Sequence, residues 1–209
     1  LQNLSQTSIL NDSNDYQTVH LSMDLAAGKF RINPGKELVN VFGNRLNEKD
    51  IILTQHKDVK NRHAEIKLDF KNFINNSANR NYEIQLDTIP IWDIELSMGA
   101  ADCEFDLSAF KVKKMEIGAG ASQIQIKFGD LYPDVELEIE TGMASTQIEI
   151  PRSMQCTITN ESGLSDLDVN GFKKSVKGVY VSENQNDSIK GSIRIHIESG
   201  MSNINIIRY

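Results

Sequence analysis

A short phrase recurs along this chain at a nearly constant spacing. Residues 140–150 read ETGMASTQIEI, residues 161–169 read ESGLSDLDV, and residues 198–206 read ESGMSNINI. With two earlier copies, the glycines of the phrase are Gly99, Gly120, Gly142, Gly163 and Gly200. They are 21, 22, 21 and 37 residues apart, so the last step is one period plus an insertion. Such a period is typical of folds that stack one structural unit on the next.

Apolar and polar residues alternate on both sides of each glycine. Strict alternation over a few residues is typical of a β-strand with one buried face. Each copy therefore predicts two short strands joined by a bend. Glycine is required at the bend because the chain there adopts a positive φ or lies close to a neighbouring backbone. Gly28, within residues 19–35 (VHLSMDLAAGKFRINPG), continues the pattern and is a sixth predicted bend glycine.

These repeats predict an all-β fold, a single-stranded β-solenoid-like stack of ~21-residue repeats. One repeat cannot bury its apolar face alone, but stacked copies share a continuous core. An antiparallel β-sandwich is the alternative, since hairpins show the same alternation. The stack is favoured because the corners lack the Asn-Gly pairs that hairpins prefer. The predicted inward residues are Ile94, Leu96, Met115, Ile117, Ile124, Ile126, Val135, Leu137, Ile139, Ile148, Ile150, Ile158, Leu167, Val169, Ile193, Ile195, Ile197, Ile204 and Ile206.

The chain divides into three stretches that we expect to form one continuous structural unit. Residues 1–18 are a polar segment expected to be flexible, and residues 91–209 hold the repeats. Residues 19–90 alternate less regularly and predict an irregular N-terminal β region. We expect this region to cap the stack, because an uncovered sheet edge offers unpaired backbone groups to other chains.

Composition excludes several classes of partner. The formal net charge is −7 and the pI about 5.1, which argues against nucleic acid and against adsorption to anionic lipid. No apolar run is long enough for a membrane-spanning helix. The polar start of the sequence is typical of what remains after an export signal is removed, so we expect a mature or trimmed form.

The sequence predicts no catalytic, metal or cofactor site. The histidines lack zinc-ligand spacing, and the HExxH, CxxC and GxSxG motifs are absent. Cys103 and Cys156 share strand parity with core residues and are expected to be buried and unpaired. Trp92 alternates with Ile94 and is likewise expected in the core.

Acidic residues recur on the predicted outer face. Glu95, Glu116 and Glu138 stand four residues before a repeat glycine, and Glu140, Glu161 and Glu198 stand two before. Stacked in register, such carboxylates repel one another and favour a cationic partner such as Ca²⁺. A solvated face that guards against aggregation is the other interpretation, and a glycosidase-type acid/base pair is a third.

Two further groups of polar residues stand out. Amides after the glycines predict a hydrogen-bonded ladder along the stack, or a sugar-binding row. These are Gln123, Gln125, Gln147, Asn203 and Asn205. The insertion before the last repeat carries Lys173, Lys174 and Lys177 and is expected to form a solvated hairpin or a binding loop.

Three stretches together resemble a known family. They are LSMDLAAGKFRINPG, WDIELSMGAADCEFDLSAFKVKKMEIGAGASQIQIKFGD and SIRIHIESGMSNINI. They are similar to the toast-rack proteins, which are akin to the β-solenoid "putative adhesins" and to the extracytoplasmic β-domain of bacterial cell-wall-active antibiotic response proteins. The resemblance implies an exported, all-β bacterial envelope protein without catalytic activity, often lipid-anchored or attached to a membrane segment. It supplies no catalytic residues.

The resulting expectation is a non-enzymatic, exported protein of the bacterial envelope or cell surface. It would be an adhesin-like scaffold in the periplasm or on the surface, lipid-anchored in some precursors, with a protein or glycan partner. A partner-binding module in envelope-stress response and a carbohydrate-active enzyme are the alternatives.

Overall fold

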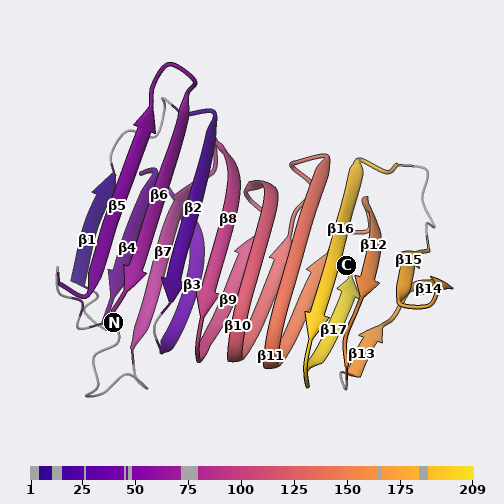
Figure 1. Ribbon diagram of the computed structural model, residues 1–209. Coiled ribbons are helices and arrows are strands. Elements are labelled where there is room, and N and C mark those ends of the chain that lie inside the picture. The colour runs from indigo at the N-terminus through magenta and orange to yellow at the C-terminus, as the bar shows by residue number, and fades with distance from the viewer. Residues whose placement is uncertain are drawn as a thin grey trace.

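The computed structural model describes residues 5–10, 16–25, 27–44, 46, 49–71, 80–163, 166–183 and 188–209. All regular elements in these residues are β-strands, and the 17 strands join in one hydrogen-bonded sheet (Figure 1). The all-β prediction is confirmed. No helix that could span a membrane occurs in the described part of the chain.

Two parallel ladders form the body of the molecule. β10 (Lys111–Phe128) and β11 (Asp134–Ile150) are long enough to run through both ladders, whereas every other strand of the ladders belongs to one. In order of pairing, the first ladder holds β6 (His63–Phe70), β2 (Thr18–Leu25), β8 (Ile91–Met98), β10, β11, β16 (Gly191–Ser199) and β12 (Met154–Asn160). The second holds β7 (Asn81–Asp87), β3 (Gly28–Gly35), β9 (Ala101–Leu107), β10, β11, β17 (Asn203–Arg208) and β13 (Asp166–Val169).

The inward-facing side chains of both ladders form a single hydrophobic core. The predicted inward residues are all buried except Leu167 and Val169, which lie on the last strand of the second ladder and are partly buried. Trp92 is also buried, as expected, and its indole Nε1 donates to the Asp87 carbonyl at 2.9 Å. Cys103 and Cys156 are buried and unpaired, and burial raises the pKa of each thiol to about 12.

The spatial order of the strands differs from their order in the sequence at both ends. Near one end, β2 and β3 lie between the β6/β7 layer and the β8/β9 layer. Near the other, β16 and β17 lie between β11 and the β12/β13 layer. The segment around Gly28 and the last copy of the phrase are therefore inserted inside the stack.

Antiparallel pairing, which the alternative β-sandwich requires, is confined to the two ends. At one end β5 (Ile51–Asp58) pairs with β6, β4 (Val39–Gly43) with β7, and β1 (Ser5–Leu10) with β4. At the other, β15 (Val179–Ser182) pairs with β12, and β14 (Phe172–Val176) with β15. These strands cover edges that the parallel ladders would leave open.

The pairing of β2 with β8 runs across residue 90, where we expected the cap to meet the repeats. Of the segment expected to be flexible, residues 1–18, the structure describes β1 and residues 16–18, and the rest lies outside the described residues. The division into three stretches stays a prediction.

Candidate functional site

The repeat glycines lie directly on one another at one edge of the stack. A Cβ added to Gly120 would lie 2.7 Å from the Gly99 carbonyl oxygen, and one on Gly200 would lie 2.9 Å from that of Gly142. None of the five repeat glycines has a positive φ. Close backbone approach is therefore the reason for glycine at Gly120, Gly142 and Gly200, whereas a Cβ on Gly99 would meet nothing within 4 Å. Gly163 stands at the end of the column, where a Cβ would meet the Gly200 oxygen only at 3.6 Å.

Gly28 occupies a different position from the other bend glycines. It begins β3 and pairs with Ala101, two residues after Gly99, so it lies outside the glycine column. A Cβ on Gly28 would lie 3.0 Å from the Arg80 carbonyl oxygen. Its neighbour in space is therefore the start of β7 and not another repeat corner.

Buried hydroxyl groups accept hydrogen bonds from backbone amides near the corners, a feature that the sequence analysis missed. Ser122 Oγ accepts from the Ala101 amide at 3.3 Å, and Ser202 Oγ accepts from the Ala144 amide at 3.2 Å. Ser202 Oγ also lies 2.9 Å from Thr141 Oγ1. The available signal is the small residue two places after Gly99, Gly120, Gly142 and Gly200, which is Ala, Ser, Ala and Ser in turn.

The upper acidic row lies on the first ladder, where Lys114 pairs with two of its three carboxylates and the third lies beside a histidine. Glu95, Glu116 and Glu138 are successive register partners, 21 and 22 residues apart. Lys114 Nζ donates to Glu116 and lies 3.5 Å from Glu138 Oε1, while His20 Nε2 lies 3.7 Å from Glu95. The hydrogen bond from Lys114 holds the pKa of Glu116 below its usual value.

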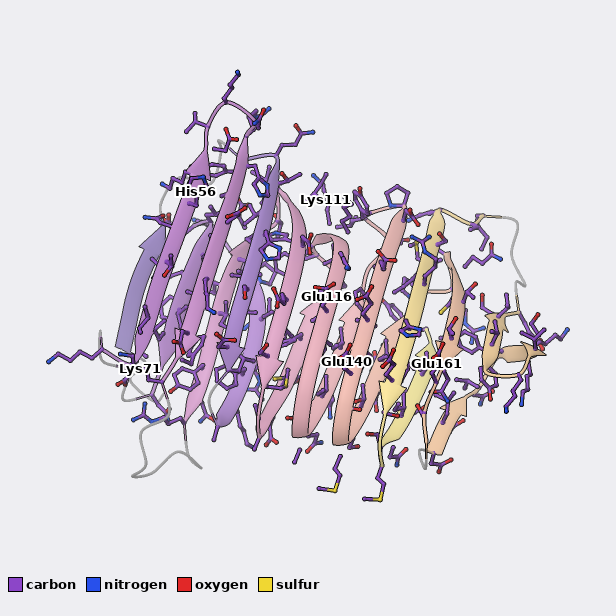
Figure 2. The ribbon with its side chains drawn as sticks, viewed as in Figure 1. His56, Lys71, Lys111, Glu116, Glu140 and Glu161 are labelled. Atoms are coloured by element: carbon purple, nitrogen blue, oxygen red, sulfur yellow. The ribbon has the colours of Figure 1, made fainter. Side chains whose placement is uncertain are left out.

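The lower carboxylates, Glu140, Glu198 and Glu161, form what we call the acidic triad. Glu140 and Glu198 are register partners, and the Glu161 amide donates to the carbonyl of Ile197, next to Glu198. Figure 2 shows Glu140 and Glu161 on either side of β16. No Lys or Arg within the described ranges forms an ion pair with the triad; the neighbour in reach is His196, whose Nε2 lies 3.1 Å from Glu198 Oε1.

A shallow hollow of about 550 Å³ borders the acidic triad. Gly118, which pairs with Ser97 on one side and Glu140 on the other, lines it. Because Gly118 has no side chain, the surface beside Glu140 is left open. The structure thus divides the six predicted acidic residues into a compensated row and an uncompensated triad.

Glu116 does not meet the requirement for the acid of a glycosidase pair. A glycosidase acid needs a carboxyl with a raised pKa. Among the described residues, every resolved carboxyl shift is downward, at Asp58, Asp106, Glu116, Asp130 and Asp134. In the same part of the chain, no group of three His, Cys, Asp or Glu side chains is placed to hold a metal ion.

The predicted amide residues lie on the second ladder. Gln125, Gln147 and Asn205 are successive register partners, and Asp168 of β13 pairs with Asn205 at the end of the row. The Gln147 amide donates along its own strand to Glu149 at 3.0 Å. Further along this face Arg31 donates to Glu104 at 2.8 Å.

The three lysines of the insertion belong to the β14–β15 hairpin and its turn. Lys173 Nζ lies 3.5 Å from Glu183, and Lys174 Nζ lies 5.9 Å from the centre of the Tyr180 ring. β15 adds to the edge of β12, so the hairpin extends the sheet.

The chain was compared with known families and structures. A model of the N-terminal domain of toast_rack, DUF2154, matches residues 2–149. A crystal structure described as a "putative cell adhesion protein" from Clostridium sporogenes ATCC 15579 has a TM-score of 0.83 at 22% identity, covering 99% of this chain and 100% of that one. This similarity shows a shared fold.

A "putative adhesin" from Bacteroides fragilis NCTC 9343 has a TM-score of 0.36 at 8% identity, covering 99% of this chain and 98% of that one. That score is too low to support an argument. No curated protein sequence matches the chain.

Proposed function

The chain belongs to the toast-rack family, and from this premise we propose that it is a non-enzymatic, exported protein of the bacterial envelope or cell surface, where it acts as an adhesin-like binding scaffold. The Clostridium sporogenes protein that shares this fold is described as a "putative cell adhesion protein", which supports the proposal. An exported scaffold of this kind would work in the periplasm or on the surface, lipid-anchored where its precursor carries an attachment signal.

We further propose that the body of the molecule is a β-solenoid-like stack of repeats. Parallel partners 21 and 22 residues apart along β8, β10 and β11 support this proposal, as does the column of corner glycines. A stack of this kind is rigid and presents long, flat faces, which suits a scaffold better than a catalyst.

The observation that carries the binding role is the acidic triad. Three carboxylates on adjacent layers have no Lys or Arg partner in the described ranges, although Lys114 compensates the row beside them. Like charges on neighbouring strands repel, and a cationic partner would relieve that repulsion. We propose a partner whose contact surface is rich in Lys or Arg, or a glycan that carries amino groups.

A microsphere adhesion assay tests this role. Beads coated with the protein would be applied to surfaces of immobilised basic protein, chitosan or neutral dextran, at low and at physiological salt. We expect retention on the basic protein or on chitosan, weaker retention at higher salt, and none on dextran. Replacing Glu140, Glu161 and Glu198 with Gln should remove most of this retention.

The matched control is the Gln replacement of Glu95, Glu116 and Glu138, which lie on the same face but are compensated. This variant should keep most of the retention. Equal losses in both variants would show that general negative charge, and not the acidic triad, causes adhesion. Retention that survives in the triad variant would contradict the proposal.

A further inference from the structure

The last strand of the second ladder, β13, is shorter than its neighbour β17, and a pocket lies beside it. β13 has four residues and pairs with residues 203–206 of β17. Ile207 and Arg208 continue β17 beyond it and pair with β11 on their other side. The chain leaves β13 through a turn in which Gly171 has a φ of +84°. A pocket of about 530 Å³ lies here, lined by residues from β13, β17 and the turn, with Arg152 and Glu183.

The β14–β15 hairpin encloses this end of the molecule. It lies beyond β12 and β13 in Figure 1, and the Glu183 amide donates to the Gly171 carbonyl at 3.1 Å. The pocket volume is within the range that small ligands occupy in proteins.

Two arginines border the pocket without a carboxylate partner. Arg208 Nη2 donates to the carbonyls of Arg152 at 3.2 Å and Met154 at 2.6 Å, and its guanidinium lies 5.8 Å from the centre of the Phe172 ring. Arg208 Nη1 is buried and has no hydrogen-bond partner. Burial lowers the pKa of Arg208, and no ion pair of Arg208 or Arg152 is found where the structure describes the chain.

Arg208 is partly buried and Arg152 is exposed. A partly buried guanidinium group without a carboxylate partner is stabilised when an anion lies beside it. A carboxylate matches the guanidinium fork geometrically and forms charge-assisted hydrogen bonds with it. A carboxylate in the pocket would be attracted by the positive charges of Arg152 and Arg208, and the buried Nη1 of Arg208 would have to turn towards the pocket to donate to it.

The other lining residues determine what else the ligand must carry. Asp168 and Glu183 are acidic, and Asn205 adds an amide. Together with the two arginines they leave the lining without net charge, which disfavours a dianion such as phosphate. These acceptors suit a ligand that also donates hydrogen bonds.

We propose that this pocket binds a small carboxylate that also carries hydrogen-bond donors. Arg152 and Arg208 would hold the carboxylate, while Asp168 and Asn205 would accept from the donors. An amino acid and a sugar acid share this chemistry, through an ammonium group in the first and hydroxyls in the second.

The test is a titration of the full ¹⁵N-labelled chain with alanine, with glucuronate and with glucose, followed by amide chemical shifts. At least one of the two carboxylates should saturate at millimolar concentration and shift the amides of Asn170, Gly171 and Ile207. Glucose, which has hydroxyls but no carboxylate, should not. Arg152→Gln should weaken binding by ~10-fold or more, the loss expected for one charged hydrogen bond.

The Asp168→Asn variant distinguishes an amino acid from a sugar acid as the ligand. It should weaken alanine several-fold, because it removes the charge facing the ammonium, and should leave glucuronate nearly unchanged. Asp166→Asn, two residues earlier on the same strand and outside the pocket lining, is the matched control and should change neither. The proposal is overturned if neither carboxylate saturates, if glucose binds equally well, or if Arg152→Gln binds like the unmodified chain.

Discussion

Gly118 and Gly120 lie two residues apart on β10, yet an added methyl group would meet different surroundings at each. At Gly120 it would lie 2.7 Å from the Gly99 carbonyl oxygen, a backbone atom that cannot move without shifting the neighbouring layer. At Gly118 the nearest atom is the Leu96 carbonyl oxygen at 3.8 Å, an ordinary contact. Both residues are glycines, but only at Gly120 does the close approach of the neighbouring backbone require one.

Gly120→Ala should therefore lower the free energy of unfolding by roughly 1–3 kcal/mol, the usual cost of overpacking. Gly118→Ala is the matched control and should raise it by about 0.5 kcal/mol, because alanine reduces the freedom of the unfolded chain. Chemical denaturation of both variants measures the two changes. Equal effects would show that close approach at the corner is not the reason for glycine.

Thr146 places a hydroxyl in an otherwise apolar row, where it pairs with Ile124 and Ile204. Its side chain is 2% exposed, and Oγ1 has no hydrogen-bond partner. Thr141, by contrast, is buried with Oγ1 2.9 Å from Ser202 Oγ. The same residue type is thus unsatisfied at one position and satisfied at the other.

Thr146→Val should raise the free energy of unfolding by about 1 kcal/mol, since a methyl group replaces an unsatisfied hydroxyl of similar shape. Thr141→Val should lower it by about 1 kcal/mol, because Ser202 loses a partner. Differential scanning calorimetry should show opposite shifts in the unfolding temperature. Shifts of the same sign would mean that Thr146 is satisfied in solution.

At the scale of elements, antiparallel strands cover the outer edges of β6, β7 and β12. β15 covers the edge of β12 through the register pairs Thr157 with Val181 and Thr159 with Val179. β14 then pairs with β15 and becomes the outer edge. Its lysines suit that position, because charged side chains on an edge strand hinder pairing with another molecule.

Val181→Pro should detach this hairpin, because proline cannot donate in the middle of three paired strands. The exposed edge of β12 should then associate with other copies. Light scattering coupled to size-exclusion chromatography should show oligomers that increase with protein concentration. Val176→Ser, on exposed outer strand β14, is the control and should behave like the parent chain. A Val181→Pro variant with unchanged mass would show that the hairpin is not the closing element.

At the scale of the whole molecule, two exposed ion pairs link the inserted last layer to the chain around the start of β11. Lys190 Nζ lies 2.7 Å from Asp130, and Arg194 Nη1 lies 2.6 Å from Asp134. Each pair joins the chain at or before β11 to residues at the start of β16. Hydrogen bonds from Lys190 and from Arg194 hold the pKa of Asp130 and of Asp134, respectively, below the usual value of 3.8.

These lowered pKa values predict acid sensitivity. A carboxyl whose pKa is lowered by folding stabilises the folded state above the unfolded pKa, and this stability is lost as the pH falls through the folded pKa. The unfolding temperature should therefore fall as the pH is lowered below about 4. Asp130→Asn should lower it at neutral pH and flatten the acid dependence, whereas Asp166→Asn, an exposed carboxylate of β13, should do neither. An unchanged acid profile in Asp130→Asn would contradict this role.

The amino-acid pattern is enough to predict which side of each strand faces the core and how far apart the corners lie. Side chains alternate strictly along a β-strand, so the pattern around Ile148 or Ile195 assigns each residue to the core or the surface whatever strand lies beside it. The glycine spacing likewise indicated where layers meet, and the family resemblance is confirmed by the match to residues 2–149.

Which layers lie next to one another is seen only in the tertiary structure. Layers with the same alternation could pair with one another in almost any order. Their actual order depends on the lengths of the connections and on specific contacts, such as that of Lys190 with Asp130. The spacing of the repeats does not specify either of these. That order places Glu198 between Glu140 and Glu161, with Lys114 one layer beyond Glu140. It also leaves β13 as the short last strand beside Arg208. Both candidate sites of this protein follow from the order of its layers, which the repeats do not specify.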